Sequence, residues 1–288
     1  MLMGVQINKT AILLLVGVAL TLLFIYYPSV SSDKKSELSR VESVENFAKE
    51  ALENKVRVFG GVAQDGQIIN MTWEDMKENA MQNNRITCTE GTFEVKGLQV
   101  YRRECVNIED APIGTLLFLH GQSFKSLTWK DLGTLIVMAS YRYRTVAIDL
   151  PGYGETPKSD IPNKADFLMD VMTALKIEKP ILISPSMSGQ YALPLVMKHA
   201  EALKGYVPVA PVATESFSDA EYKNNQIPAL VVYGEKDTML GEKSASKLRL
   251  FPNSQEHKLK DAGHAAYLNQ PLEFHRLLRD FSDKLFGS

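Results

Sequence analysis

A strand-like run that leads into a serine-rich turn constrains this chain more than any other stretch. The apolar run Pro180–Ile183 precedes Ser184-Pro185-Ser186-Met187-Ser188-Gly189, and the helix-like run Gln190–His199 follows the turn. A buried strand, a tight turn and a helix form the setting in which a nucleophile elbow presents a serine hydroxyl at the carboxyl end of the strand. We therefore expect Ser186 at the tip of such a turn.

The turn departs from the usual G-x-S-x-G pattern, in which small residues two positions before and after the nucleophile let the turn close. Ser184 and Ser188 occupy these positions, and serine is small enough for the same geometry. Either of them could also be the nucleophile, but neither has small residues at both flanking positions. Because a Ser/Pro-rich loop between a strand and a helix would show the same pattern, the downstream chain must decide.

Strand-like and helix-like runs alternate from about Glu90 to the end of the chain. The strand-like segments are 92–95, 98–104, 115–119, 145–148, 180–183, 206–210, 228–234 and 257–259, and the helix-like segments are 128–140, 166–176, 190–199, 241–250 and 272–285. Continuous apolar strands are typical of a sheet that is buried on both faces. The sequence therefore predicts an α/β fold of the alpha/beta-hydrolase type, a doubly wound, mostly parallel sheet with helices on both faces.

An acid and a histidine follow the serine in the order that this fold requires. Asp237 comes directly after the strand-like run 228–234, and His264 follows Ala262-Gly263 just before the closing helix. Glu235 lies nearer the strand end and is the alternative acid, more typical of a surface carboxylate. For His264 the alternative is an ordinary solvated loop histidine. We expect Ser186, Asp237 and His264 to form a catalytic triad.

These residue types suit nucleophilic catalysis. A serine hydroxyl attacks a carbonyl only when an imidazole takes its proton, and the carboxylate holds that imidazole in the correct tautomer. The oxyanion of the tetrahedral intermediate needs preorganised donors, and we expect the backbone N–H groups of Met187 and Gln122 to supply them. His120 and Asp149 are interpreted as structural, the first bonding its loop and the second bracing the turn at Pro151-Gly152.

Composition excludes some other functions. A net charge of −2 and a pI near 6.2 give no sign of nucleic-acid binding. The five histidines are scattered, and neither H-E-x-x-H nor C-x-x-C occurs, so no metal site is expected.

Only about fifteen residues separate Val212 from Pro228. This is too short for a large cap domain, so we expect an open site with a short flap, helical over Ser218–Tyr222, that accepts a small acyl group.

A hairpin around Lys96-Gly97 opens the globular domain, which is expected to span residues 90–288. If this two-residue turn sets the register, paired residue numbers sum to 193 and Cys88 faces Cys105, in the closer type of cross-strand pair. Lysine is unfavourable at the positive φ that such a turn needs, so two unlinked thiols are the preferred interpretation. A disulfide would instead indicate an oxidising compartment.

The N-terminal part predicts a membrane anchor. After a short tail (residues 1–10), residues 11–27 are apolar or aromatic apart from Gly17 and Thr21, close to the lower limit for a spanning helix and longer than the usual signal-peptide core. The alternative is a cleaved signal peptide, with the small residues Ser29 and Ser31 before the cut. Residues 28–89 are polar and are expected to be a stalk or linker. In this segment Asn70-Met71-Thr72 is a candidate glycosylation site if the region is lumenal. The flanking charges leave the side of the membrane open.

Six stretches together resemble the alpha/beta hydrolase domain-containing protein fourteen group. They are His120-Gly121, Asp149-Leu150-Pro151-Gly152-Tyr153-Gly154, Ser184–Gly189, Val207-Pro208-Val209-Ala210-Pro211, Tyr233-Gly234-Glu235-Lys236-Asp237 and Ala262-Gly263-His264. The Ser-Pro-Ser-x-Ser-Gly turn is far more specific than a generic elbow. The likeness covers about 90–286, and the apolar N-terminal segment resembles the membrane-anchored A branch.

The resemblance implies the triad Ser186, Asp237 and His264 and an esterase-type activity on short acyl esters, thioesters or amides. It also implies protein-lysine deacylation with coenzyme A as a candidate acyl acceptor, and a single-pass type II topology. No other cofactor is expected. The expected partners are a small acyl substrate or an acylated protein, the membrane through residues 11–27, and a protein partner. A non-enzymatic interaction protein on a hydrolase fold is the alternative.

Overall fold

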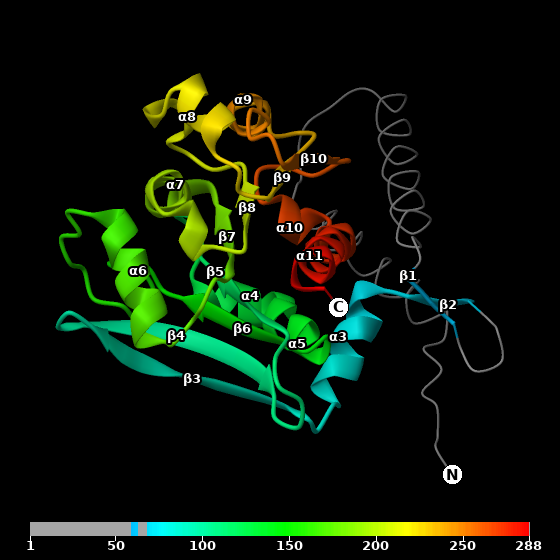
Figure 1. Cartoon of the computed structure of the whole chain (residues 1–288). Coiled ribbons are helices and arrows are strands. Elements are labelled where there is room, and N and C mark those ends of the chain that lie inside the picture. Colours follow the sequence, from blue (N-terminus) through cyan, green and yellow to red (C-terminus); the bar gives the residue numbers. More distant parts are fainter. Residues whose placement is uncertain (1–58, 63–67, 288) are drawn as a thin grey trace, which may run out of the picture. The chain divides into compact units, whose positions relative to one another are not determined.

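The computed structural model describes residues 59–62 and 68–287, and its centre is an eight-stranded sheet (Figure 1). In spatial order the strands are β10 (Ser254–Leu259), β9 (Ala229–Gly234), β8 (Gly205–Val209), β7 (Ile181–Pro185), β5 (Gly114–Phe118), β6 (Tyr143–Ile148), β4 (Leu98–Asn107) and β3 (Ile86–Val95). The pairings from β10 to β6 are parallel, whereas β4 is antiparallel to both β6 and β3. The mostly parallel sheet is confirmed.

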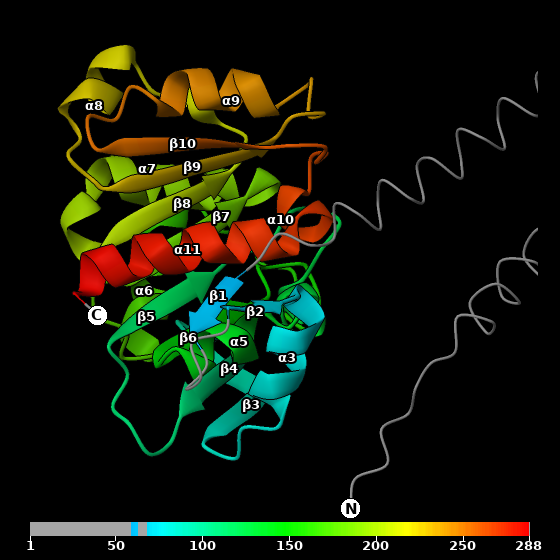
Figure 2. The same cartoon turned by 90° about the vertical axis from the view of Figure 1, so that its right-hand side faces the viewer.

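Helices cover both faces of the sheet, and successive strand residues alternate between two cores. The first core, which includes Leu117, Leu182 and Val231, is covered by α6 (Lys164–Ala174), α7 (Gly189–Lys198) and α9 (Gly241–Leu248). The second core, which includes Phe118, Ile183 and Val232, is covered by α4 (Ser126–Leu132), α5 (Thr134–Ser140), α10 (Ala266–Asn269) and α11 (Pro271–Phe286). Figure 2 shows α11 and α5 on the near face. This is the doubly wound arrangement that the sequence predicts.

Two helices differ from the sequence prediction. The single helix expected over 128–140 is divided into α4 and α5 at Gly133, whose φ of 87° lies in the left-handed region that ends a helix. The short helix α10 between His264 and α11 was not expected. The segment between β8 and β9 holds only η3 (Thr214–Ser216) and α8 (Asp219–Asn224), with Ser218 as N-cap, so the expected short helix is confirmed. Asn225 at its end bonds the Val196 carbonyl in the C-terminal half of α7, so a position over the site is not shown.

Helix α3 (Trp73–Met81) packs on the molecule N-terminal to the expected start at Glu90. It follows the antiparallel pair β1 (Phe59–Val62) and β2 (Ile68–Met71), and Thr72 caps it through a capping box with Asp75. Trp73 is buried, its ring stacks on His275 at 3.9 Å between centroids, and its Nε1–H donates to the carbonyl of Leu132. Part of the segment expected as a linker therefore belongs to the packed structure.

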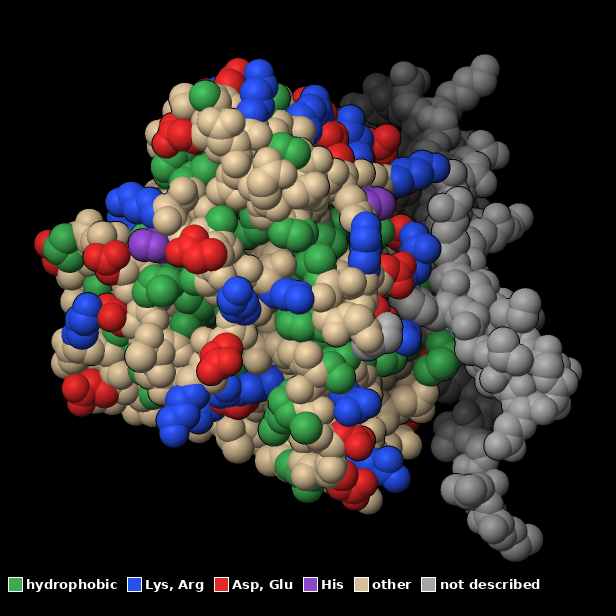
Figure 3. Space-filling model, in the orientation of Figure 1, with side chains coloured by type: hydrophobic (Ala, Val, Ile, Leu, Met, Phe, Trp, Pro, Cys, Tyr) green, Lys and Arg blue, Asp and Glu red, His purple; other side chains and the backbone are tan. Residues whose placement is uncertain are grey.

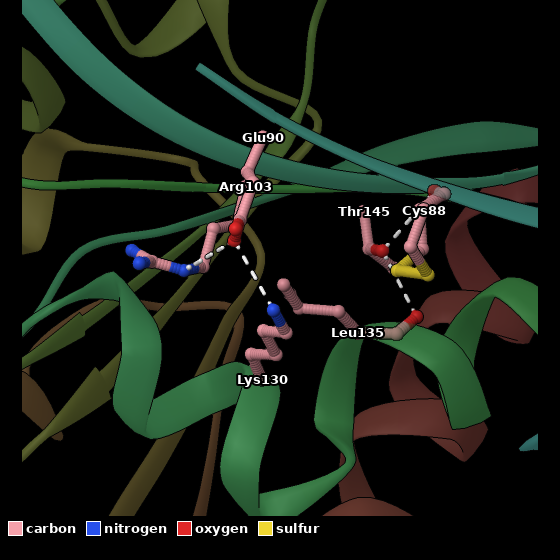
Figure 4. The surroundings of a disulfide bond; sticks show 7 residues. Cys88, Glu90, Arg103, Lys130, Leu135 and Thr145 are labelled. Carbon is pink, nitrogen blue, oxygen red and sulfur yellow. Dashed lines mark hydrogen bonds and ion pairs between the residues drawn. A yellow bond between two sulfur atoms is a disulfide. The ribbon is translucent and has the colours of Figure 1, made fainter. Parts of the chain in front are cut away.

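The β3–β4 hairpin has the predicted register, but the prediction about its cysteines was wrong. Cys88 pairs with Cys105, and the two form a disulfide with a Cα–Cα distance of 4.1 Å (Figure 4). The close distance agrees with the nearer type of cross-strand pair. Lys96 adopts a φ of 47° before Gly97 at 85°, so the two-residue turn forms despite the side chain. The Lys96 ammonium pairs with Asp170 of α6 at 2.6 Å.

Several N-terminal predictions fall outside the described residues. They concern the tail (1–10), the membrane anchor (11–27) and most of the linker (28–89). Within the described ranges, no helix combines the length and the apolar character that a bilayer crossing requires.

Candidate active site

Ser186 lies on a sharp corner between β7 and α7. Pro185 ends the strand, and Ser186 begins the 3₁₀ turn η1 (Ser186–Ser188) with a φ of 51°. A residue with a side chain adopts this left-handed conformation only where its surroundings impose it, which is typical of functional sites. Gly189 is required by contact, because a Cβ there would lie 2.4 Å from the carbonyl oxygen of Val212. The corner is therefore the elbow that the sequence predicts.

The structure brings the three predicted side chains together. His264, in the loop after β10, has its Nε2 2.8 Å from Ser186 Oγ and its Nδ1 2.6 Å from Oδ2 of Asp237, which follows β9. With a carboxylate at Nδ1, the proton of the neutral ring lies on that nitrogen, and Nε2 is free to accept from the serine hydroxyl. Ser, His and Asp thus form a continuous hydrogen-bonded chain.

The environment of Asp237 favours its charged form. Its side chain is 4% exposed, and such burial alone would raise the pKa of the carboxyl. The hydrogen bonds from His264 and from the backbone N–H groups of Leu240 and Gly241 outweigh burial and hold the pKa of Asp237 below its usual value. The carboxylate can therefore orient His264 over the neutral pH range.

Glu235, the alternative acid, is engaged elsewhere. It is exposed, and its carboxylate accepts the backbone N–H of Asp261 at 3.0 Å. The contact to His264 is made by Asp237 alone of the two. The geometry therefore favours Asp237 as the candidate acid.

The acid loop and the histidine loop meet backbone to backbone. The N–H of Lys236 donates to the carbonyl of Ala262 at 2.8 Å, and a Cβ at Gly234 would lie 2.1 Å from the carbonyl oxygen of Gly263. Only glycine permits this approach. The two loops are consequently fixed relative to each other.

The backbone N–H groups of Gln122 and Met187 are oriented by hydrogen bonds to the carbonyls of the same peptide planes. The carbonyl of Gly121, in the same peptide plane as the Gln122 N–H, accepts the Phe124 N–H at 3.1 Å and lies 2.9 Å from His120 Nδ1. The carbonyl of Ser186, in the plane of the Met187 N–H, accepts the Val212 N–H at 2.9 Å. In a trans peptide the N–H points opposite to the C=O. Neither N–H has a protein acceptor among the residues that the structure covers, so both remain candidates for oxyanion donors.

His120 and Asp149 have the structural roles predicted for them. Nε2 of His120 accepts the Leu150 N–H at 3.0 Å, and burial lowers the pKa of His120, so the ring is neutral with its proton on Nδ1. Asp149 is fully buried and accepts the backbone N–H groups of Ser126 and Glu155. Together these bonds hold the loops that follow β5 and β6.

The serines that flank Ser186 are buried and hydrogen-bonded to the turn itself. Ser184 Oγ lies 3.1 Å from Ser188 Oγ, and the Ser188 hydroxyl donates to the Pro185 carbonyl at 2.8 Å. Both side chains are fully buried, whereas Ser186 is partly exposed beside His264. The geometry therefore favours Ser186 over its neighbours as the nucleophile.

Three backbone donors, those of Leu240, Gly241 and Val212, are not predicted from the sequence. The Leu240 N–H reaches Asp237, and an acidic residue three positions before the donor is a weak signal for such a turn. The Val212 N–H, which holds the Ser186 carbonyl, lies in the loop after the neighbouring strand β8, and no sequence signal indicates this contact.

In the described part of the chain no group of histidines, cysteines and acidic residues has the arrangement of a metal site. Asn70, the glycosylation candidate, pairs through its backbone with Gly60 in the β1–β2 ladder, and its modification stays a prediction. On the face seen in Figure 3, basic and acidic side chains are interspersed, with hydrophobic ones in small groups between them.

Residues 116–220 match the model of the alpha/beta hydrolase family. Protein ABHD14A of Danio rerio is 43% identical over 195 residues, which are 65% of this chain and 72% of that protein. The Homo sapiens protein named "Putative protein-lysine deacylase ABHD14B" is 41% identical over 198 residues, which are 67% of this chain and 94% of that protein.

Solved structures show the same fold. The predicted CIB-like hydrolase of Thermoplasma acidophilum superposes with a TM-score of 0.65 and 25% identity, covering 69% of this chain and 100% of that one. The carboxylesterase CesB (YbfK) of Bacillus subtilis gives a TM-score of 0.59 at 19% identity, covering 73% of this chain and 96% of that one. The second likeness concerns the fold alone.

Proposed function

The chain belongs to the alpha/beta hydrolase family, in the ABHD14 group, and we propose that it is a serine hydrolase that cleaves short acyl esters, thioesters or amides. The observation that carries the proposal is the hydrogen-bonded chain from Ser186 through His264 to Asp237. All three side chains follow the carboxyl ends of strands, where the sheet positions them.

Acyl transfer proceeds in two steps. The Ser186 oxygen attacks the carbonyl carbon, its proton passes to Nε2 of His264, and the carbonyl π electrons move onto the oxygen. When the intermediate collapses, the bond to the leaving group breaks and the imidazolium returns its proton to that group. Water then attacks the acyl-enzyme with His264 as base, which releases the acid and restores the serine hydroxyl.

The oxyanion is stabilised by the N–H groups of Met187 and Gln122 in this proposal. Their peptide planes are held by bonds to the carbonyls of Ser186 and Gly121, so the donors are oriented before the substrate arrives. Removing one donor of this kind typically costs about 3–4 kcal/mol of transition-state stabilisation.

Substrate access supports short acyl groups on leaving groups of varied size. The segment between β8 and β9 is limited to η3 and α8, which is too short for a cap domain, and the His264 side chain is 43% exposed. An exposed site admits the tip of an acylated lysine, and one relative is named as a protein-lysine deacylase. We include that amide among the substrates, with coenzyme A as an acyl acceptor that competes with water.

Placement in an oxidising compartment completes the proposal. Disulfides persist in secretory and extracellular environments and are rare in the cytosol, which supports a lumenal hydrolase domain. The apolar segment 11–27 would then be a type II anchor, and Asn70 would be accessible to glycosylation.

A fluorophosphonate probe on the full chain tests the reaction class. We expect labelling of the wild type and none of Ser186→Ala, and an acyl-chain series should show the highest kcat/KM for the shortest esters. Faster product release with coenzyme A would identify it as an acceptor. A folded wild type without labelling would contradict the proposal and favour a non-enzymatic interaction protein.

A further inference from the structure

The two serines at the glycine positions of the elbow form a hydroxyl chain under the nucleophile. Ser188 has one hydroxyl proton, and it points to the carbonyl of Pro185 at 2.8 Å. The bond of 3.1 Å between the two serine oxygens must therefore be donated by Ser184. Glycine at either position could not supply these bonds.

The Ser188 bond fixes one of the two peptide planes that meet at Ser186. The torsions φ and ψ of a residue set the orientation of the planes before and after its Cα. The carbonyl of the preceding plane, that of Pro185, is held by Ser188, and the carbonyl of the following plane, that of Ser186, is held by the Val212 N–H. Holding both planes holds Ser186 at its φ of 51°.

This backbone conformation directs both parts of the chemistry. It points Ser186 Oγ at Nε2 of His264, 2.8 Å away, and it sets the direction of the Met187 N–H. A residue with a side chain does not hold such a φ unless its surroundings over-determine it. Without the Ser188 bond, the plane before Ser186 is free to rotate toward a negative φ.

We propose that Ser184 and Ser188 are positioning residues for the nucleophile, which hold Ser186 in its reactive conformation through the Pro185 carbonyl. The inference rests on the proposed function, because it concerns the same serine. Neither residue is catalytic, since each acts through the backbone. The proposal also explains how an elbow without the usual flanking glycines is held closed.

A buried serine that bonds a carbonyl elsewhere provides the matched control. Ser282 in α11 is fully buried, and its hydroxyl donates to the Leu278 carbonyl at 2.7 Å. Ser188→Ala and Ser282→Ala each delete one hydroxyl and leave one carbonyl without that donor, and Ser188→Ala also removes the acceptor of the Ser184 hydroxyl. Both are expected to lower Tm, Ser188→Ala by somewhat more, and only the first lies at the nucleophile.

The experiment measures kcat, KM and the second-order fluorophosphonate labelling rate of the full chain, well below Tm. We expect Ser188→Ala to lower kcat and the labelling rate about tenfold, less than the roughly hundredfold effect of an ångström of misplacement, with KM unchanged. Ser184→Ala should lower them about threefold, since it acts through Ser188 and one neutral hydrogen bond is a modest effect. Ser282→Ala should leave them unchanged.

Each other result overturns the inference. A Ser188→Ala variant that labels at the wild-type rate excludes the positioning role while the proposed function stands. Equal losses in Ser188→Ala and Ser282→Ala would mean a general packing effect. If Ser188→Ala does not fold, Ser188→Gly takes its place with the same expectation. A folded wild type that does not label overturns the proposed function and this inference together.

Discussion

The active-site edge, formed by the carboxyl ends of β7, β9 and β10, and the disulfide hairpin, formed by β3 and β4, are stabilised by different means. Every residue of β7 and β9 is buried, whereas β10 is partly exposed, and the loops beyond these three strands are held by backbone contacts and hydrogen bonds. Strand β3 is mostly exposed and lies at the edge of the sheet. It is held by its antiparallel pairing with β4 and by a covalent bond to that strand.

Figure 4 shows how the hairpin is attached to its surroundings. Thr145 donates to the carbonyls of Cys105 and Leu135, while Glu90 pairs with Arg103 and Lys130. The exposed pair of Glu90 with Lys130 contributes little, so the disulfide and the antiparallel ladder with β4 are the main constraints on the edge strand. The comparison shows that backbone contacts between loops position the side chains of the candidate site, whereas the disulfide helps to keep the edge strand β3 on the sheet. Changes at the active-site edge should therefore alter rates, and changes on the hairpin side should alter stability.

The largest effect is expected for Asp237→Asn. An amide at this position favours the wrong tautomer of His264, and a substitution of this kind in a serine triad lowers kcat about 10⁴-fold. Steady-state kinetics with a short ester would measure it. Glu235→Gln is the control, because Glu235 bonds the Asp261 backbone instead, and its kcat should stay at the wild-type value. A large loss in the control would contradict the assignment of the acid.

The second largest effect is expected when the disulfide of the β3–β4 hairpin is removed. Replacing Cys88 and Cys105 by serine opens a link across a sequence separation of 17, which should lower the free energy of unfolding by about 3 kcal/mol. For a domain of this size that corresponds to a fall in Tm of roughly 6–12 °C. Calorimetry would measure it, with kcat at 25 °C as the second readout. A folded double variant with a much lower kcat would break the comparison.

A smaller effect concerns the pH dependence of stability, through His275 of α11, which stacks on Trp73 of α3. Burial lowers the pKa of His275 from 6.5 to about 3, and its bond to the Pro271 carbonyl offsets this only in part. Below pH 6.5 the unfolded chain takes up a proton here and the folded chain does not. Stability should therefore fall as pH decreases from about 6.5 to about 3, by about 2 kcal/mol at pH 5 relative to neutral pH.

Denaturant titrations at several pH values would measure this slope. His275→Phe keeps a ring against Trp73 and removes the titrating group, so its stability should depend less on pH than that of the wild type. Equal slopes in both proteins would show that His275 does not contribute.

The smallest effect is expected beneath the elbow. The hydroxyl of Tyr206 is fully buried, and burial raises its pKa while neighbouring Ser184 offsets this only in part. It has no hydrogen bond of full geometry among the described residues. Tyr206→Phe should therefore leave kcat unchanged and change the free energy of unfolding by at most about 1 kcal/mol, toward greater stability. A clear loss of kcat would extend the hydroxyl chain of the elbow to Tyr206.

The sequence allowed most of the arrangement of the candidate site to be predicted, because it depends on strand order. Asp237 and His264 follow apolar strands at the right places, and the parallel sheet brings the ends of these strands to one edge. The hairpin register followed in the same way from the turn at Lys96-Gly97. The bond between Cys88 and Cys105 differs from the prediction, because the pairing of the strands outweighs the general unfavourability of lysine at a positive φ.

Contacts between distant segments could not be predicted. Helix α3 is recognised by what it packs against, namely Val137 of α5 and His275 of α11, and neither partner is visible in the helix's own sequence. The division between α4 and α5 likewise depends on the left-handed conformation of Gly133, which the continuous apolar pattern over 128–140 does not indicate. Local patterns fix elements, whereas their boundaries depend on tertiary packing.

The contact between Gly234 and the chain at Ala262-Gly263 restricts how this protein can evolve. Any other amino acid at position 234 would collide with the main chain of the neighbouring turn and carry His264 away from Ser186. Substrate preference can drift without such a barrier through the exposed side chains of Gln122 and Ser123, which follow Gly121 beside Ser186. We therefore expect homologues that diverge in specificity to vary at these two positions while glycine persists at position 234.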